Sequence, residues 1–363
     1  MTSSPTLIFT GGHHTGALEV AKKLQQSGVA VIWLGHRHSL WGDRRDSAEY
    51  REVTASGFPF YDLQAGKLYR TFNPLKLFRL PWGFVQSFAL LLALKIRLGS
   101  DLKGIVSFGG YLAVPVVCAG WLLGLPALTH EQTLTQGWAN RFISRFVKKN
   151  ALSWPAGAAH YPAGKTVVTG LPLRPWLLTL HPRPTVPPTI YITGGKQGSH
   201  VINQAVFAAL PELLAGFQVV HQTGDNSLFP DHETALKLRS ELPASRQSRY
   251  RVFSYLTSAE LAGVFSSRPL VISRSGAHII YELMLLKLPC VLIPLPRSSH
   301  AEQLQNAELL VSFHQAVLLP QSGLTPRSLL AAVTAAGGLQ PDPPPVLLDG
   351  LDHLIQLIKQ ELL

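Results

Sequence analysis

Short apolar runs alternate with helix-like segments along almost the whole chain, and this alternation limits the fold more than any other feature. The runs carry continuous apolar residues rather than an every-second-residue pattern, which is typical of strands buried on both faces. Strands of this kind separated by helices predict parallel sheets covered on both sides, an α/β fold. Ten runs fit: TLIF, VAVIWLG, GIVSFG, PALTH and TVVTG in the first half, then TIYIT, FQVVHQT, RVFSY, LVISRS and CVLIPL.

Two proline-rich stretches divide the chain. HPRPTVPP at 181–188 excludes helix and central strand, so it predicts a linker, and PDPPP at 341–345 marks a second boundary. We therefore expect one domain over 1–176, a linker over 177–189 and a second domain over 190–340. The last segment, 347–363, has apolar residues at helical spacing: Leu351, Leu354, Ile355 and Ile358. Two such domains predict a ligand cleft where the carboxyl ends of their strands meet.

The composition indicates a reducing compartment. The 363 residues are 46% hydrophobic, enough for two cores, and contain only two cysteines, Cys118 and Cys290, both in apolar surroundings. A disulfide framework is therefore not expected. The start MTSSPTLIF lacks the basic and apolar regions of a signal peptide, and no uncharged apolar run reaches 18 residues, so we expect no transmembrane helix.

The positive charge is confined to the first half. Residues 1–176 hold 19 Lys and Arg against 8 Asp and Glu, whereas residues 177–363 hold 13 of each, and the net charge is +11. This asymmetry favours an anionic partner of the first half, either nucleic acid or an acidic membrane, over a merely soluble basic surface.

The segment 70–103 separates these alternatives. It mixes aliphatic and aromatic residues with cations and has no acid before Asp101, and its run Phe88–Leu92 favours a membrane interface over nucleic acid. Phe84–Leu94 fits equally well an ordinary helix covering the sheet. For Leu75–Trp82, bracketed by Pro74 and Pro81, we expect an exposed membrane-contacting element. The cations of the segment are Arg70, Lys76, Arg79, Lys95 and Arg97.

TGGHHTG at 10–16 lies on a predicted strand-to-helix turn. Its spacing is not GxGxxG and no acid ends the next strand, so nicotinamide binding is not expected. Adjacent glycines let the backbone approach a ligand closely, and a histidine there can accept a proton from a hydroxyl. The alternative is a pair of exposed loop histidines.

Two further turns suit a nucleotide diphosphate. GGKQGS at 194–199 offers Lys196 to a phosphate, although such a turn also occurs for steric reasons alone. SRSGAHIIYE at 273–282 opens a helix with free amides at Ser275–Ala277. Glu282 follows as a ribose ligand or as a solvated helix residue. Glu302, Gln303 and Asn306 lie close enough on one later helix to share a site.

Together the motifs resemble the MurG family of bacterial peptidoglycan glycosyltransferases, from about residue 6 to 310 at matched spacing. Each motif is modest alone, and the order of all eight is specific. They are TGGH, FGGY (108–111), THEQ (129–132), GLPLR (170–174), GGKQG, HQTGD (221–225), RSGA (274–277) and EQLQNA (302–307).

The resemblance implies a GT-B fold of two Rossmann-like domains, with the last helix returning to the N-terminal one. It implies inverting transfer of N-acetylglucosamine from UDP-GlcNAc to the C4 hydroxyl of undecaprenyl-pyrophosphoryl-MurNAc-pentapeptide (lipid I), forming lipid II. It also implies no tightly bound metal, no cofactor, no nucleic acid, and a peripheral place on the cytoplasmic face of the cell membrane, whose anionic surface is a partner.

The resemblance also assigns residues. His13 becomes the candidate base, whereas His14 occupies a position that the family does not fix and is expected to be a bystander. The acceptor-side residues implied are Gly11, Gly12, Gly109, Gly110, Tyr111, His130, Glu131, Gln132 and Thr133. The UDP-sugar-binding residues implied are Arg174, Lys196, Leu256, Ser275, Gly276, Ala277, Glu282, Gln303 and Asn306.

The chain departs from the family pattern at several positions. Ile8 and Phe9 stand where the longer GGTGGH loop has its first two glycines, and Leu171 stands in the family's GNP. Thr133 replaces an asparagine, and Lys196 replaces a serine that contacts the donor. Two alternatives therefore stay open: a related lipid glycosyltransferase with a diacylglycerol-type acceptor, and a non-catalytic nucleotide-sugar-binding homologue.

Overall fold

The computed structural model describes residues 4–38, 46–64, 79–135, 137–225, 228–298, 301–342 and 346–363, with only the backbone at 79 and 80. The chain divides into two compact units. The first comprises Met1–Arg174 together with Leu347–Leu363, and the second comprises Pro175–Val346. The second unit thus already includes the proline-rich segment that the sequence analysis expected to be a linker.

The first unit is built on a parallel sheet. Its described strands number seven, in the order β3-β2-β1-β4-β5-β6-β7. The first strand, β1, lies inside the sheet; β2 and β3 follow on one side of it, and β4 to β7 follow on the other. The strand order therefore reverses between β1 and β4, and ligands of open α/β sheets bind at such a point. The strands are β1 (Thr6–Thr10), β2 (Ala30–Gly35), β3 (Phe60–Asp62), β4 (Leu102–Ser107), β5 (Ala127–Glu131), β6 (Lys149–Leu152) and β7 (Thr166–Val168).

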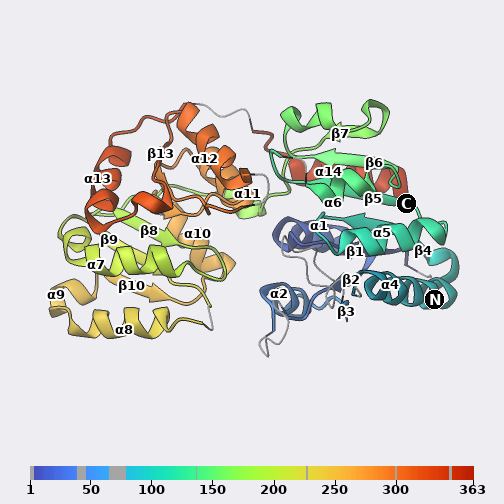
Figure 1. Ribbon diagram of the computed structural model, residues 1–363, viewed down its shortest axis with the longest axis horizontal. Helices are drawn as coiled ribbons and strands as arrows, with labels where there is room; N and C mark the ends of the chain where they lie inside the picture. The colour runs from blue at the N-terminus through green and yellow to red at the C-terminus, as the bar shows by residue number, and fades with distance from the viewer. Residues whose placement is uncertain are drawn as a thin grey trace. The chain divides into compact units, whose positions relative to one another are not determined.

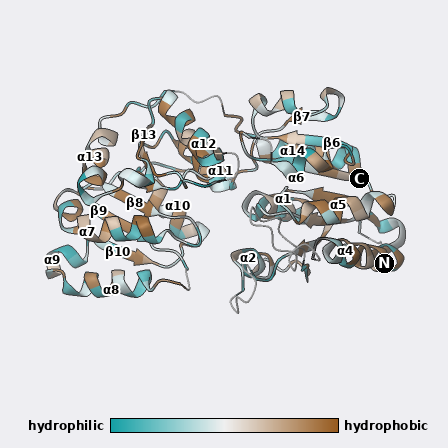
Figure 2. Cartoon of the chain, in the orientation of Figure 1, coloured by the Kyte–Doolittle hydropathy of each residue, from teal (hydrophilic) through white to brown (hydrophobic). Residues whose placement is uncertain are grey.

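Helices cover both faces of this sheet. In β1, Leu7 and Phe9 enter one core cluster and Ile8 enters the other, because successive strand residues point to opposite faces. This explains the continuous apolar runs, and Figure 2 shows the hydrophobic colour along α5, which packs on β4 and β5. The helices are α1 (His14–Gln26), α2 (Ala48–Ala55), α4 (Arg79–Leu98), α5 (Ala113–Leu122), α6 (Trp138–Ile143) and α14 (Gly350–Leu362).

The C-terminal helix α14 belongs to the first unit, where its red ribbon lies among the blue and green elements (Figure 1). Leu354 and Ile358, from the apolar stripe seen in the sequence, are buried in the same cluster as the inner face of α1. Gly350 begins this helix against the backbone of residues 170 and 171, and a Cβ there would lie 2.5 Å from the Leu171 carbonyl oxygen. The chain end therefore completes the core of the N-terminal sheet.

Helix α4 explains the apolar part of the basic segment. Within the described residues one helix, Pro81–Asp101, has the length and composition of a membrane span. Its residues Leu91 and Leu94 are nonetheless buried in the core of the first unit, where α4 packs against α5, while Trp82 and Ile96 are exposed. Phe84–Leu94 is thus a covering helix with one outward apolar face. Of the expected element Leu75–Trp82, residues 75–78 lie outside the described residues.

The second unit repeats the design with a smaller sheet. In its described part six parallel strands run in the order β10-β9-β8-β11-β12-β13, which reverses between β8 and β11. The strands are β8 (Thr189–Thr193), β9 (Gln218–Gln222), β10 (Tyr250–Phe253), β11 (Leu270–Ser273), β12 (Cys290–Leu292) and β13 (Ala316–Leu318). The helices are α7 (His200–Gly216), α8 (Asp231–Glu241), α9 (Ala244–Gln247), α10 (Ser258–Ser266), α11 (Ala277–Leu286), α12 (Glu302–Ser312) and α13 (Pro326–Gly337).

Candidate active site

Three loops of the first unit meet at the carboxyl edge of its sheet. β4 lies between β1 and β5, so the turns after these strands are neighbours. The Gly12 N–H donates to the Gly109 carbonyl oxygen at 3.0 Å, and the Phe108 N–H donates to the Thr10 carbonyl oxygen at 2.8 Å. The segments TGGH and FGGY, nearly 100 residues apart in sequence, therefore form one backbone-lined edge.

Glycine is required where these two turns cross. Gly11 has φ +136°, and a Cβ there would lie 2.7 Å from the Phe108 nitrogen. Gly110 has φ +76°, and its Cβ would lie 3.0 Å from the Gly12 nitrogen. Both values are shorter than ordinary contacts, and L side chains rarely adopt either conformation. Gly11 and Gly110 are thus required as glycines where the two loops cross.

His13 is the last residue before α1. It takes the N-cap position with a side chain that makes no capping hydrogen bond, and it is half-buried. Burial lowers the pKa of His13 from its usual value, and the Glu131 carboxylate acts in the opposite direction. The imidazole is therefore neutral at pH 7, the form in which it accepts a proton from a hydroxyl.

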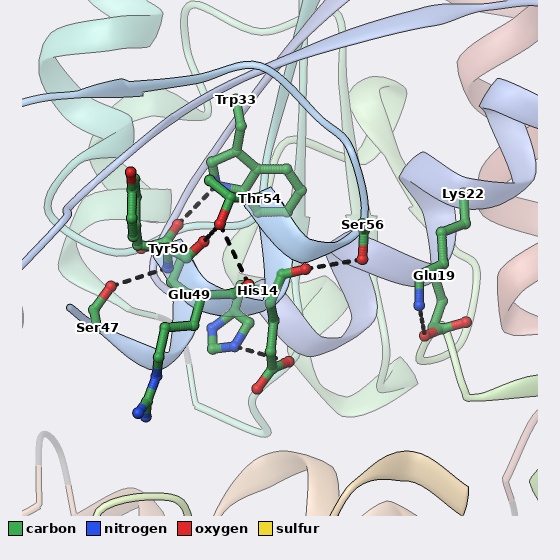
Figure 3. Close-up of polar contacts among 11 residues, drawn as sticks. His14, Glu19, Lys22, Trp33, Ser47, Glu49, Tyr50, Thr54 and Ser56 are labelled. Carbon is green, nitrogen blue, oxygen red and sulfur yellow. Dashed lines mark hydrogen bonds and ion pairs between the residues drawn. The ribbon is translucent and has the colours of Figure 1, made fainter.

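His14 has a different environment. Its Nε2 lies 3.3 Å from an Oε2 of Glu52 on α2, a contact that Figure 3 draws beneath the helix. The neighbouring α2 is held to β2 by Glu49, whose carboxylate accepts the Trp33 indole N–H at 2.8 Å. His14 thus links α1 with α2 and is turned toward Glu52.

Glu131 is the polar centre of the HEQ segment. Its side chain is buried and accepts five hydrogen bonds from the described residues. Oε1 accepts from the Thr133 N–H at 3.0 Å and hydroxyl at 2.7 Å, and Oε2 accepts from Asn140 Nδ2 at 2.8 Å, the Gly137 N–H at 3.2 Å and the Tyr161 hydroxyl at 3.4 Å. Thr133, which replaces the family's asparagine, is therefore engaged with Glu131. Asn140, on α6, was not predicted from the sequence.

His130 and Gln132 are buried on either side of Glu131. His130 Nε2 donates to the Gly170 carbonyl oxygen at 3.1 Å, and burial lowers the pKa of His130 to about 4, so this ring is neutral. The Gln132 carbonyl oxygen accepts the Trp154 indole N–H at 3.2 Å. Through these hydrogen bonds both residues stabilise the carboxyl edge of the sheet from its buried side.

Tyr111 closes the FGGY turn. Its ring stacks on that of His36, which follows β2, with centroids 5.0 Å apart and planes at 28°. The turn after β2 therefore joins this edge of the sheet, although the sequence reasoning gave His36 no role.

The glycine turn of the second unit is also a backbone crossing. Gly198 has φ +76°, and a Cβ there would lie 2.0 Å from the Thr223 carbonyl oxygen. At Gly224 a Cβ would lie 2.1 Å from the Gly198 nitrogen. The steric explanation thus holds for this glycine pair. By contrast, Gly195, with φ +87°, has no atom within 4 Å of its Cβ position, and the adjoining Lys196 is half-buried.

The turn after β11 presents a helix N-terminus. Helix α11 begins at Ala277 with Gly276 as an N-cap that has no side chain to satisfy the free amides. The Ser275 hydroxyl donates instead to the Gln303 carbonyl oxygen at 2.6 Å, and Asn306 Nδ2 donates to the Ser275 carbonyl oxygen at 2.9 Å. Ser275, Gln303 and Asn306 are thus brought together, and the amides of this turn suit an anion.

Arg274 organises this edge and was not singled out from the sequence. Its guanidinium donates to the carbonyl oxygens of Ile293 and Pro294, to Ser199 Oγ at 2.8 Å and to Gln321 Oε1 at 2.7 Å. Burial lowers the pKa of Arg274. This one side chain therefore joins the turns after β8, β11 and β12. Arg274 belongs to the motif RSGA, but the motif alone did not predict this role.

The other predicted donor residues lie in the same unit, apart from Arg174, the half-buried last residue before the division. Glu282 lies on α11 and is buried, with 3% of its surface exposed, so the alternative of a solvated helix residue is wrong. Leu256 is buried after β10, and its N–H donates to Gln222 Oε1 at 3.3 Å. Gln303 accepts the Leu295 N–H at 2.9 Å.

Two parallel Rossmann-like sheets with glycine turns at their carboxyl edges define the GT-B class of glycosyltransferases. A solved structure of this class, Acinetobacter baumannii MurG, matches 98% of this chain and 99% of its own at a TM-score of 0.64 and 26% identity. The likeness therefore covers nearly the whole chain and includes the range of about residues 6 to 310 over which the motifs resemble the family.

The chain belongs to glycosyltransferase family 28. The N-terminal domain of that family matches residues 7–152 and the C-terminal domain matches residues 189–337. A relative from Bacillus cereus, named a UDP-N-acetylglucosamine–N-acetylmuramyl-(pentapeptide) pyrophosphoryl-undecaprenol N-acetylglucosamine transferase, is 31% identical over 90% of both chains. One of the same name from Legionella pneumophila is 32% identical over 91% of this chain and 88% of its own.

Proposed function

We propose that this chain transfers N-acetylglucosamine from UDP-GlcNAc to the C4 hydroxyl of lipid I, with inversion, at the cytoplasmic face of the bacterial cell membrane. The observation that carries the proposal is the full-length likeness to transferases named for this reaction. The glycine crossings at Gly11 and Gly198, and the histidine that follows the first, support it because they fall on the motifs that carry the likeness.

On the acceptor side, His13 is the base. It takes the proton of the C4 hydroxyl while that oxygen attacks the anomeric carbon of the donor sugar. The bond between this carbon and the diphosphate oxygen breaks, and its electron pair leaves with UDP. The neutral state of His13 and its freedom from capping support this role.

On the donor side, the unit Pro175–Val346 binds the nucleotide sugar. The uncapped N-terminus of α11 at Ser275–Ala277 stabilises the charge that develops on the leaving diphosphate, together with Lys196, whose ammonium replaces a neutral serine contact. The Glu282 carboxylate accepts hydrogen bonds from the ribose hydroxyls, and Leu256 contacts the uracil ring. Gln303 and Asn306 bind the N-acetylglucosamine of the donor.

The membrane contact is formed by α4, α5 and α6, which pack side by side in that order. Their outer faces expose aromatic and aliphatic side chains, among which Ile96 and Trp138 are each 76% exposed. Arg97, Arg141 and Arg145 are exposed beside them. Apolar groups entering the acyl boundary among cations that meet anionic head groups are what a peripheral membrane surface needs. The other apolar members are Trp82, Val85, Leu92, Trp121, Leu122 and Phe142.

A turnover matrix tests the proposal. The purified chain is offered UDP-GlcNAc, UDP-glucose or UDP-galactose with either lipid I or diacylglycerol, and UDP release is measured. We expect release only from UDP-GlcNAc with lipid I. Turnover of diacylglycerol would identify a different lipid glycosyltransferase, and donor binding without turnover on either lipid would identify a non-catalytic homologue.

A further inference from the structure

Gln222 is the last residue of β9, the strand that lies between β8 and β10 in the second sheet. The residue is buried, with 5% of its surface exposed. It belongs to the motif HQTGD, in which the resemblance to the family assigned no site residue. Because β8 and β10 flank it, its side chain lies within reach of the turns that follow both strands.

Both ends of the Gln222 amide are engaged. Nε2 donates to the Gly195 carbonyl oxygen at 3.2 Å, in the glycine turn after β8. Oε1 accepts the Leu256 N–H at 3.3 Å, in the turn after β10, and the Tyr191 hydroxyl at 3.2 Å. A primary amide carries its donor and its acceptor on one planar group. The side chain therefore links the position of the turn at Gly195 to that of the turn at Leu256.

The turn at Gly195 is the one that carries Lys196. The Gly195 carbonyl oxygen also accepts the Gly198 N–H at 3.1 Å, and this hydrogen bond closes the turn. The Lys196 carbonyl oxygen accepts the Asp225 N–H at 3.3 Å. Gln222 thus donates to the same oxygen on which the turn closes, and it helps to fix the backbone on either side of Lys196.

The turn at Leu256 is reached by the side chain of Gln222 rather than by the neighbouring backbone. The Thr223 N–H donates to the Phe253 carbonyl oxygen at 2.9 Å, which fixes the end of β10 three residues before Leu256. UDP carries its uracil and its diphosphate on opposite sides of the ribose. Strong binding of both groups at once therefore depends on the spacing of the two turns that hold them.

We propose that Gln222 couples the uracil end of the donor site to its diphosphate end, as a positioning residue that acts through the two turns. The role rests on the proposed function, in which Leu256 contacts the uracil and Lys196 the diphosphate. A nucleotide that orders the turn at Leu256 thereby also orders the turn at Lys196. The affinity that the diphosphate adds to that of uridine consequently depends on Gln222.

The test compares the affinities of the purified chain for UDP and for uridine, with no acceptor present. Calorimetry gives the dissociation constant for UDP, and competition against UDP gives that for uridine. We expect the ratio of the uridine constant to the UDP constant to fall about five- to tenfold in Gln222→Met, the equivalent of one neutral hydrogen bond. Gln218→Met makes the same change at the other, half-buried end of β9 and should keep the wild-type ratio.

An unchanged ratio in Gln222→Met would overturn the proposal even if both affinities fall, because a merely structural role weakens both ligands alike. If that variant does not fold, Gln222→Asn, which keeps the amide but shortens its reach, replaces it under the same criterion. A wild-type chain that binds UDP no better than uridine would contradict the proposed donor site, and this role with it. Failure of the coupling and failure of the proposed function are therefore distinguishable.

Hydrogen exchange followed by NMR gives a second readout. Uridine lacks the diphosphate, so any protection that it confers on the turn at Lys196 comes through the protein. We expect saturating uridine to slow exchange of the Gly198 amide in the wild type and to leave it unchanged in Gln222→Met. Slowing that persists in the variant, or that is missing from the wild type, would contradict coupling through Gln222.

Discussion

At the scale of the residue, the carboxyl edge of the N-terminal sheet depends on the absence of side chains. The turns after β1 and β4 approach so closely that one hydrogen bond joins Gly12 to Gly109 and no Cβ fits at Gly11. The backbone itself therefore forms the surface beside His13, and the histidine is the first side chain to project from it along the chain. This close approach explains why a glycine stands at position 11.

Gly11→Ala tests this close approach. The added Cβ would meet the Phe108 nitrogen at 2.7 Å at a φ of +136°, so we expect the free energy of unfolding to fall by about 2 to 4 kcal/mol, measured by denaturant titration. Gly57→Ala is the matched control, because Gly57 has φ +80° with no atom within 4 Å and should cost only about 1 kcal/mol. Equal losses in both variants would argue against a steric role for Gly11.

His13→Ala tests the base. We expect turnover to fall by about 100-fold or more while the dissociation constant for UDP-GlcNAc stays within about twofold of wild type, because the base acts on the acceptor. His14→Ala removes the adjacent histidine, which pairs with Glu52, and should retain most of the turnover. If His13→Ala keeps wild-type turnover in the UDP-release assay, His13 is not the base.

At the scale of the element, one polar side chain in each unit joins several loops at the carboxyl edge of the sheet. Arg274 does this in the second unit by joining the turns after β8, β11 and β12. Asn140 does this in the first unit, where it joins α6 to the end of β5 by hydrogen bonds to Thr129 and Glu131. The two residues thus hold together loops at the carboxyl edges of their sheets.

Arg274→Lys tests the tie. A lysine presents a single ammonium and does not span four acceptors, so we expect unfolding to become easier by about 2 to 4 kcal/mol and binding of UDP to weaken in parallel, measured by denaturant titration and calorimetry. Arg268→Lys is the matched control, since exposed Arg268 donates only to the carbonyl oxygens of Leu286 and Lys287. Similar decreases in unfolding free energy and UDP binding in the two variants would contradict a special role of Arg274.

Charge reversal of Arg97 and Arg141 tests the proposed membrane surface of α4 to α6. We expect the Arg97→Glu and Arg141→Glu double variant to bind anionic vesicles at least about tenfold more weakly, since each cation near such a surface contributes about 1 kcal/mol. Vesicle sedimentation measures the loss. The control reverses the exposed Lys237 and Arg239 of α8, and an equal loss there would indicate net charge rather than a docking face.

At the scale of the whole molecule, both units carry a buried neutral histidine. His130 has a pKa lowered to about 4 and His221, hydrogen-bonded to Tyr250 and Asn203, a pKa lowered to about 3. The unfolded chain binds these protons near pH 6.5, so the neutral forms contribute their full stability above that pH and lose it as pH falls toward the folded values. Each unit is therefore sensitive to acid.

Urea titrations at pH 7.5 and pH 5 measure this dependence. We expect the unfolding midpoints to fall at pH 5 by an amount equivalent to about 1.4 kcal/mol per histidine and pH unit below 6.5. His221→Gln should lower the stability of the second unit at pH 7.5 but flatten its pH dependence. An unchanged slope in that variant would mean that other groups cause the acid sensitivity.

The sequence predicted the architecture well because a parallel sheet leaves a strong signal. Continuous apolar strands, glycine turns and the eight ordered motifs led to the GT-B class and to the family that the comparisons establish. Asn140 and His36 gave no such signal, because each is a polar residue outside the motifs whose contact, with Glu131 or with Tyr111, is set by tertiary packing. The burial of Glu282 likewise depends on tertiary packing that helical position alone does not reveal.

The measurement that tests the central claim most directly is transfer of labelled sugar. The purified chain is incubated with UDP-GlcNAc labelled in the sugar, with lipid I or diacylglycerol in vesicles, and the lipid fraction is extracted. We expect label to enter the lipid fraction only with lipid I, in a β linkage, and to be lost in His13→Ala. Label that stays with the nucleotide, or that enters diacylglycerol instead, would contradict the assignment of this chain to lipid II synthesis.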